Sequence, residues 1–288
     1  MARYNDWTSP EIDTKTPSAA RLYDYYLGGA HHFEADRELG RQVLEALPDL
    51  PFMAQRNRMF VIRAVRMLVG HGFTQFVDVG CGLPATGAVH EVVQQVNPDS
   101  RVIYVDNEPV AIAHGELMLA DVPGTGVVGG DLREPESFLD HPTTRELLDF
   151  TKPIVVVAAA VMHFVTDQEN PAGVMTKIRH ALPAGSLVVF SHGTAGDDAV
   201  GSRAVVDLYE QSSNHAVPRT TAQVAALLAG YQLLGSGVTW VTEICPEEGE
   251  PTDDGPRSHM LGAVAAVPDG ADTPEMAELS KRLASAGK

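Results

Sequence analysis

The sequence is poor in cysteine and in basic side chains. Cys81 and Cys245 are the only cysteines among 288 residues, so no disulfide framework is expected, and free thiols suit a reducing compartment. Lys and Arg number 21 against 38 Asp and Glu, which gives a formal net charge of -17. Because nucleic-acid binding normally relies on Lys and Arg to neutralise phosphates, this balance argues against a nucleic-acid partner.

The chain also lacks a long apolar segment. Its longest apolar run, from Ile154 to Val161, falls far short of the roughly 20 residues that cross a bilayer. The first residues, Met1-Ala2-Arg3-Tyr4-Asn5-Asp6, contain no apolar stretch of the kind that a signal peptide needs. We therefore expect a cytoplasmic protein with no membrane partner. The sequence leaves a monomer and a homodimer both open.

Three parts are predicted along the chain. Residues 1–70 form an N-terminal helical extension, because the helical pattern from about 18 to 68 precedes the first convincing strand. That pattern is interrupted at Gly28-Gly29, Pro48 and Pro51. Residues 71–267 alternate between short apolar strands and helices, and residues 268–288 form a polar tail.

The alternation in the central part predicts an α/β fold with a doubly wound, mostly parallel, seven-stranded sheet. Strands separated by helices of this length imply right-handed crossovers between parallel neighbours. Two further strand candidates follow one another with no helix between them, which suggests an antiparallel hairpin at the sheet edge. The seven strand candidates are 75–79, 101–105, 126–129, 153–158, 186–190, 232–244 and 261–267.

A glycine turn follows the first strand. Gly80 and Gly82 would let the backbone approach a ligand closely, and the helix expected to open there would offer free N–H groups. Cys81 fits between them because it is small. The spacing Gly80-x-Gly82-x-x-Ala85 also satisfies a dinucleotide fingerprint, so a nicotinamide-dependent oxidoreductase stays open as an alternative.

Three acidic residues stand at the carboxyl ends of the first three strands. Asp78 would repel a pyrophosphate but suits a ligand with an ammonium group, such as S-adenosylmethionine. Asp106 is placed to accept hydrogen bonds from both ribose hydroxyls. Asp131 can accept from the adenine amino group, and the adjacent Leu132 can pack on the ring. The three acids converge on one crevice and favour a nucleoside ligand with an ammonium group.

Several segments resemble a bacterial S-adenosylmethionine-dependent methyltransferase family long described only as a domain of unknown function. The similarity runs from about residue 17 to 267. The segments that carry it are Phe76–Pro84, Val102–Asn107, Gly130–Arg133, Asn57-Arg58, Phe33–Arg37 and, most specifically, Pro17–Gly29. The resemblance implies a class I, Rossmann-like methyltransferase with S-adenosyl-L-methionine as cofactor. Its predicted cofactor-binding residues are Asp78, Gly80, Cys81, Gly82, Asp106, Asn107, Asp131, Leu132 and Ala158.

Methyl transfer needs a positioned nucleophile and, for some acceptors, a general base. His163, just after the fourth strand, is a candidate for that base or for a hydrogen-bonded wall residue. His31 and His32 follow the glycine pair, where a lid hinge would lie; His32 is the second catalytic candidate, and a solvated surface pair is the alternative. The substrate-wall candidates are Tyr23, Tyr26, His31 and Phe33. An aromatic cluster such as Tyr23, Tyr26 and Phe33 at helical spacing is more often part of a core than of a substrate wall.

Other motifs are missing, and their absence narrows the class of molecule that could accept the methyl group. Ala158-Ala159-Ala160 stands where an Asp/Asn-Pro-Pro-aromatic motif would indicate DNA methylation, and it offers no carboxylate for a magnesium site. His31-His32-x-Glu34 has no third ligand motif, so no metal site is predicted. The sequence therefore predicts a methyltransferase that acts on a small molecule. A non-catalytic protein that binds S-adenosylmethionine, as a sensor or partner, is the alternative.

Overall fold

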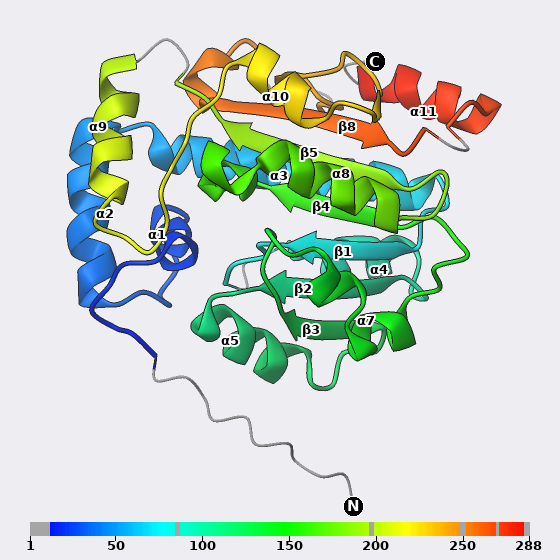
Figure 1. The fold of residues 1–288 in the computed structure, drawn as a ribbon, viewed down its shortest axis with the longest axis horizontal. Helices are drawn as coiled ribbons and strands as arrows, with labels where there is room; N and C mark the ends of the chain where they lie inside the picture. Colours follow the sequence, from blue (N-terminus) through cyan, green and yellow to red (C-terminus); the bar gives the residue numbers. More distant parts are fainter. Residues whose placement is uncertain (1–11, 84–86, 196–198, 248–251, 269–270, 285–288) are drawn as a thin grey trace, which may run out of the picture.

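A computed structural model gives the fold and describes residues 12–83, 87–195, 199–247, 252–268 and 271–284. The first eleven residues of the predicted extension and parts of the predicted tail lie outside the described residues. In these ranges, one central sheet has helices on both of its faces (Figure 1). Its strands are β1 (Gln75–Val79), β2 (Arg101–Asp106), β3 (Thr125–Gly129), β4 (Val155–Ala159), β5 (Leu187–Gly193), β6 (Gln232–Leu233), β7 (Thr239–Trp240) and β8 (Met260–Ala266).

The first five strands are parallel and confirm the predicted doubly wound sheet. The order across the sheet is β3-β2-β1-β4-β5-β8-β6. Val77 at the centre of β1 pairs with Ile103 on β2 and with Val156 on β4, and all three side chains are buried. Strands covered on both faces need apolar side chains on both faces, which explains the unbroken apolar runs in the sequence.

Two groups of helices cover the two faces. One face is covered by α3 (Leu50–Gly70), α4 (Val89–Val96), α5 (Pro109–Leu119) and α11 (Pro274–Ala284). The other face is covered by α6 (Glu136–Leu139), α7 (Pro142–Leu147), α8 (Pro171–Ala181) and α10 (Thr221–Leu227). The described part also has short 3-10 helices at η1 (Met162–Phe164), η2 (Asp167–Glu169) and η3 (Pro256–Ser258).

The end of the sheet differs from the prediction of one strand over 232–244. Two short strands, β6 and β7, stand there instead, and both pair antiparallel with β8. Gly235 and Gly237 between them have positive φ angles of 62° and 74°, so the chain turns where a continuous strand was expected. Within the described residues the sheet therefore has eight strands, one more than predicted, because one strand candidate is divided in two; β8 runs antiparallel to β5.

Helices α1 (Ala19–Tyr26), α2 (Glu34–Ala46) and α9 (Ala199–Tyr209) form a cluster at the left of Figure 1. With the first turns of α3 they enclose a small core of their own, which includes Leu22, Leu39 and Val43. Helix α3 continues from this cluster onto the sheet and packs into the main core. The domain division at residue 70 stays a prediction. Among the described helices, none is both long and apolar enough to cross a membrane.

Candidate functional site

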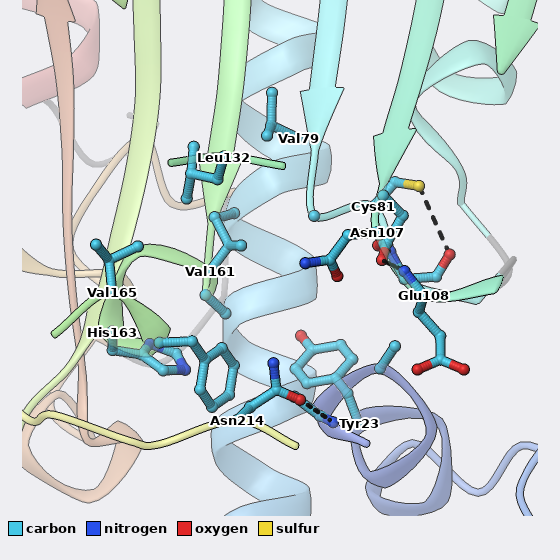
Figure 2. Close-up of a pocket in the computed structure, with 18 of the residues that line it drawn as sticks. Tyr23, Val79, Cys81, Asn107, Glu108, Leu132, Val161, His163, Val165 and Asn214 are labelled. Carbon is cyan, nitrogen blue, oxygen red and sulfur yellow. Dashed lines mark hydrogen bonds between the residues drawn. The ribbon is translucent and has the colours of Figure 1, made fainter. Parts of the chain in front are cut away.

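A cavity of about 700 Å³ opens at the carboxyl ends of β1 to β4, in the size range of small-molecule sites. Its walls come from the strand ends, from α1 and α3, and from the loop between α9 and α10. Figure 2 shows Cys81, Asn107 and Glu108 on one side and His163 and Val165 on the other. The predicted site residues that line the cavity are Tyr23, Tyr26, Asp78, Gly80, Cys81, Gly82, Asp106, Asn107, Asp131, Leu132 and His163.

The glycine turn after β1 is held by its own backbone. Gly80 and Gly82 have φ angles of 66° and 64°, which glycine adopts without strain. The Gly80 N–H donates to the Val105 carbonyl at 2.8 Å, and the Gly82 N–H donates to Oδ2 of Asp106 at 2.8 Å. The expected helix begins only at Val89, so the prediction that it opens directly at the turn is wrong. The N–H groups of Gly80 and Gly82 close the turn rather than stand free.

Asp78 is a buried carboxylate on the cavity wall, with 7% of its surface exposed. Burial raises its pKa to about 6; the positive charge of Arg58 on α3 lowers the pKa, and the charge of Asp106 raises it further. Within the described part of the chain, no hydrogen bond reaches its oxygens. A carboxylate in this state favours a cationic ligand group.

Asp106 ends β2 and is engaged on both oxygens. Oδ2 accepts from Gly82, and Oδ1 accepts from the backbone N–H of Glu108 at 2.9 Å. Burial raises the pKa of Asp106, and these two hydrogen bonds oppose that rise. Each carboxylate oxygen keeps a second acceptor position, so Asp106 can still receive hydroxyl groups from a ligand.

Asp131, after β3, is paired more strongly than the sequence suggested. Arg133 donates to both of its oxygens, at 2.8 and 2.6 Å, and to Glu169 on η2 at 2.7 Å. Burial alone would raise the pKa of Asp131, but the hydrogen bonds from Arg133 bring it below its usual value. Arg133 therefore joins the loops after β3 and β4 across this end of the cavity.

His163 on η1 lines the cavity with one nitrogen already used. The backbone N–H of Gly193 donates to its Nδ1 at 3.2 Å, so Nδ1 carries no proton. Burial lowers the pKa of His163 to about 3, aided by the neighbouring His192 and Arg219. A neutral ring of this kind has its proton on Nε2. The side chain is therefore an N–H donor toward the cavity and lacks the free lone pair that a general base needs.

A second polar layer lies behind His163. The His192 ring donates from Nδ1 to the Gly193 carbonyl at 2.8 Å and accepts from the Arg219 guanidinium at Nε2, at 3.0 Å. Arg219 also donates to the Val165 carbonyl at 2.9 Å and is 4% exposed. These bonds fix η1, and with it His163, against the end of β5.

The part of the wall that α1 contributes is also ordered by hydrogen bonds. Tyr23 donates to the Ala54 carbonyl at 3.0 Å and accepts from the side chain of Asn57 at 3.1 Å. Ser191 on β5 donates to Asn57 at 2.5 Å, so the relay runs from α1 through α3 to the sheet. Burial raises the pKa of the Tyr23 hydroxyl, which keeps it neutral.

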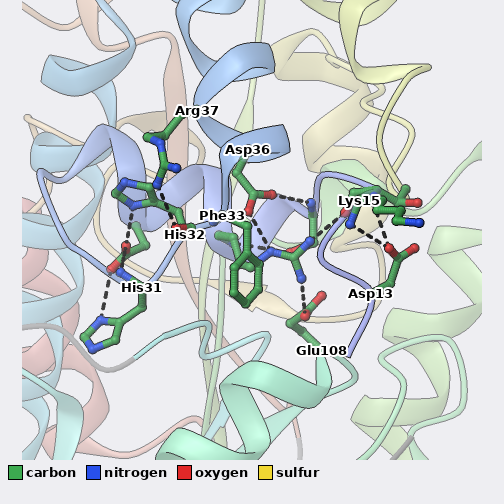
Figure 3. Close-up of polar contacts among 12 residues, drawn as sticks. Asp13, Lys15, His31, His32, Phe33, Asp36, Arg37 and Glu108 are labelled. Carbon is green, nitrogen blue, oxygen red and sulfur yellow. Dashed lines mark hydrogen bonds and ion pairs between the residues drawn. The ribbon is translucent and has the colours of Figure 1, made fainter. Parts of the chain in front are cut away.

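Four predicted site residues lie outside the cavity. Ala158 is fully buried in β4, one residue before the part of the strand that reaches the cavity. His32 contacts Asp24 through Nδ1 at 3.0 Å, and the His31 ring packs against His114. Figure 3 shows both histidines in a loop beyond α1.

The fourth of these residues, Phe33, packs beneath the Arg21 guanidinium, 5.2 Å from its ring centre. Arg21 is itself held between Asp36 at 2.8 Å and Glu108 at 2.6 Å (Figure 3). These contacts tie the loop to α2 and to the end of β2. His31, His32 and Phe33 are therefore left out of the proposed site.

Several lining residues were not found from the sequence. Arg58 and Arg133 stood within segments of the resemblance, but no spacing rule marked either as a site residue. Tyr209 and Asn214 had no signal in the sequence, because the segments that carry them meet the cavity only after folding. Asn214 lies more than one hundred residues from the glycine turn.

Comparison with known proteins places the chain in a family. Residues 5–268 match a family model described as S-adenosyl methyltransferase, and the chain belongs to that family. A DUF574 family protein from Streptomyces avermitilis superposes with a TM-score of 0.83 at 35% identity, over 88% of this chain and 99% of that one. A putative methyltransferase from Thermobifida fusca gives 0.83 at 31% identity, over 91% and 99%. No curated protein matches significantly.

These findings confirm the resemblance inferred from the motifs. They also confirm the class I, Rossmann-like fold and S-adenosylmethionine as the cofactor of the family. The order of the first five strands and the antiparallel strand beside β5 agree with that fold.

Proposed function

We propose that the protein transfers a methyl group from S-adenosylmethionine to a small-molecule acceptor. The observation that carries the proposal is Asp78, a buried carboxylate that faces the cavity beside a glycine turn and accepts no hydrogen bond from the described residues. Burying a carboxylate is costly, and the charge of Arg58 offsets only part of that cost, so the site favours a ligand that supplies a further positive charge. The ammonium group of S-adenosylmethionine supplies it, whereas the pyrophosphate of a nicotinamide cofactor would be repelled.

The remaining lining residues fit the other parts of this cofactor. Asp106 is placed for the ribose hydroxyls through its two spare acceptor positions. Leu132 offers an apolar surface for the adenine ring, with Asp131 and Arg133 at its edge. Arg58 faces the same cavity and is electrostatically coupled to Asp78, so it suits the carboxylate of the methionine part.

The chemistry that these residues perform is positioning. When bound, the cofactor supplies a methyl group activated by a sulfonium. The chain contributes a fixed ammonium partner in Asp78, a fixed ribose partner in Asp106 and a walled cavity that excludes water. His163 has no free lone pair, so it orients the acceptor through Nε2–H and removes no proton. The proposed acceptor therefore reaches the site with its nucleophilic atom already free of the proton.

Calorimetric titration with S-adenosylmethionine and S-adenosylhomocysteine tests the cofactor assignment. Wild type is expected to bind both, and Asp106→Ala is expected to bind at least tenfold more weakly. Asp99→Ala is a matched control, because Asp99 is exposed at a turn outside the cavity. Absence of binding by the wild type overturns the proposal. Unchanged affinity of Asp106→Ala overturns only the ribose assignment.

Catalysis needs a second experiment. The protein is incubated with S-adenosylmethionine labelled on the methyl group and with a metabolite extract, and labelled products are sought by mass spectrometry. Labelled small molecules are expected with wild type and should be strongly reduced with Asp78→Asn. Binding without any labelled product would instead support a non-catalytic sensor or partner protein.

A further inference from the structure

We propose that the acceptor is a carboxylic acid with a flat apolar body, held as its carboxylate by the N–H groups of His163 and Asn214. This inference rests on the proposed function, because it concerns the acceptor side of the same cavity. Both side chains line that cavity, and Figure 2 shows them on the side away from Cys81 and Glu108.

The hydrogen bonds behind His163 decide what it offers. Gly193 donates its backbone N–H to Nδ1, which forces the proton of the neutral ring onto Nε2. Among the described residues, Nε2 has no hydrogen-bond partner. An N–H group that lines a cavity and has no partner of its own favours a ligand that accepts a hydrogen bond.

Asn214 is oriented in the same sense. Its Oδ1 accepts from the backbone N–H of Ala19 at 3.0 Å and from the Ser213 hydroxyl at 2.9 Å. Those two donors fix which end of the amide faces the protein, so Nδ2 points into the cavity (Figure 2). The backbone N–H of Val217 donates to the His163 carbonyl at 2.8 Å, which holds the Asn214 loop against η1. Two donors on neighbouring segments therefore line the same cavity.

One buried positive charge lies near this part of the cavity. Arg219 lies behind the His163 and His192 rings, is 4% exposed, and its charge acts on His163. It also pairs with Asp167 at 2.6 Å, but that carboxylate is exposed, so solvent screens its charge more than that of the buried guanidinium. The carboxylates on the cavity wall stand elsewhere, at the ends of β1, β2 and β3 and on η2. A carboxylate accepts hydrogen bonds and donates none, so it matches two N–H donors. A carboxylate also has no proton to lose at neutral pH, which suits a site without a general base. One carboxylate oxygen attacks the methyl carbon of S-adenosylmethionine; the new C–O bond forms as the C–S bond of the sulfonium breaks, which gives a methyl ester and neutral S-adenosylhomocysteine.

The rest of this wall is aromatic. Phe164 stacks on Tyr209 with ring centres 5.9 Å apart, and both line the cavity together with Tyr23 and Tyr26. Flat rings pack well against such a surface. The carboxylate is therefore expected on an aromatic or similarly flat body rather than on a short aliphatic chain.

Titration of the protein saturated with S-adenosylhomocysteine tests the proposal, with benzoate as the probe. Acetate, aniline and benzylamine serve as the comparison ligands, because they lack the ring, the carboxylate and the negative charge respectively. Benzoate is expected to bind at least tenfold more tightly than each of the other three. S-adenosylhomocysteine binding is measured first, so failure of the cofactor assignment is seen separately.

Asn214→Asp identifies the donor. The new side chain can still accept from Ala19, but it turns a carboxylate oxygen into the cavity in place of the amide N–H. Benzoate affinity is expected to fall at least tenfold while S-adenosylhomocysteine affinity is unchanged. Asn97→Asp is the matched control, because it adds the same charge outside the cavity and keeps the bond that Asn97 accepts from Asp99.

Two results would overturn the proposal. One is a protein that binds S-adenosylhomocysteine but binds benzoate no better than benzylamine. The other is an Asn214→Asp variant that is folded by circular dichroism and keeps wild-type affinity for benzoate. A third variant, His163→Gln, can keep both a partner for Gly193 and an N–H donor, so it should retain more benzoate affinity than His163→Met.

Discussion

Gly82 and Asp106 join two strand ends: the Gly82 N–H donates to Oδ2 of Asp106 at 2.8 Å. The bond makes the turn after β1 and the end of β2 a single unit. The cofactor assignment depends on that unit, because the same carboxylate is proposed to receive the ribose. The two glycines of the turn differ in what surrounds them, and that difference is testable.

Gly80→Ala and Gly82→Ala should separate stability from binding. Both have positive φ angles, so each alanine costs about 1–2 kcal/mol of backbone strain. A Cβ at Gly80 would lie 2.4 Å from Val161 Cγ2, whereas a Cβ at Gly82 would meet no atom of the described residues within 4 Å. Overpacking should cost Gly80→Ala about 1–3 kcal/mol more in urea unfolding. Equal losses of stability would contradict this reading.

Asp78→Asn should stabilise the ligand-free protein while weakening cofactor binding. Burial raises the pKa of Asp78 from 3.8 to about 6, which corresponds to about 3 kcal/mol spent on keeping it ionised. The neutral amide avoids most of that cost, so the free energy of unfolding at pH 7 should rise by about 1–3 kcal/mol. If the Asp78 carboxylate instead stabilised the fold, Asp78→Asn would lower the free energy of unfolding. Thermal unfolding and calorimetry of the same samples decide between them.

Cofactor affinity should depend on pH through the same group. Between pH 3.8 and about 6, Asp78 holds more protons in the folded protein than in the unfolded chain. Ionisation of Asp78 therefore destabilises the ligand-free fold as pH rises through that window. The ammonium partner needs the ionised form. Affinity for S-adenosylhomocysteine should therefore fall by up to about tenfold per pH unit below pH 6. Asp78→Asn should lose most of this dependence.

His163 and His192 should make the fold sensitive to acid. Their pKa values of about 3 and about 4 lie below that of an unfolded histidine, 6.5. The unfolded chain therefore takes up more protons as pH falls below 6.5, and stability is lost from there down to the folded pKa values. Urea unfolding between pH 6.5 and 4.5 should show His163→Gln losing about 1 kcal/mol less per pH unit than wild type. If wild type and His163→Gln lost stability equally with falling pH, the His163 ring would not be neutral in the folded protein.

The sheet and the cofactor side were predictable because they depend on local pattern. Apolar runs at β1, β2 and β4 gave the strands to within about two residues, and Asp78 and Asp106 were found from their places at strand ends. The strands near the end of the chain were harder to predict. Gly235 and Gly237 interrupt a run that otherwise resembles one long strand.

The acceptor side was not predictable, because it is made by contacts between distant segments. Asn214 reaches the cavity only because Ala19 and the end of α9 hold its loop in place. The sequence identified His163 but not its role, since the proton position depends on the N–H of Gly193, thirty residues away. His32 resembled a lid residue in the sequence, yet its ring is held by Asp24 in the loop after α1, outside the cavity.

Arg219 supplies the last test, because it holds the acceptor side together. It donates to the Val165 carbonyl, to His192 and to the exposed Asp167 carboxylate, and it is nearly fully buried. Arg219→Met removes these donors and leaves the carbonyl and the imidazole nitrogen unpaired, which should cost about 3 kcal/mol in urea unfolding. Arg203→Met is the control: its exposed pair with Asp207 on α9 should contribute less than about 0.5 kcal/mol.

In the same Arg219→Met variant, release of η1 should weaken benzoate binding more than S-adenosylhomocysteine binding. The cofactor residues Asp78 and Asp106 stand on β1 and β2, which Arg219 does not contact. Nitrogen NMR of the His163 ring offers an independent readout, since a loosened η1 loses the Gly193 bond that fixes the tautomer. An equal loss of both affinities would mean that Arg219 supports the whole fold rather than the acceptor side.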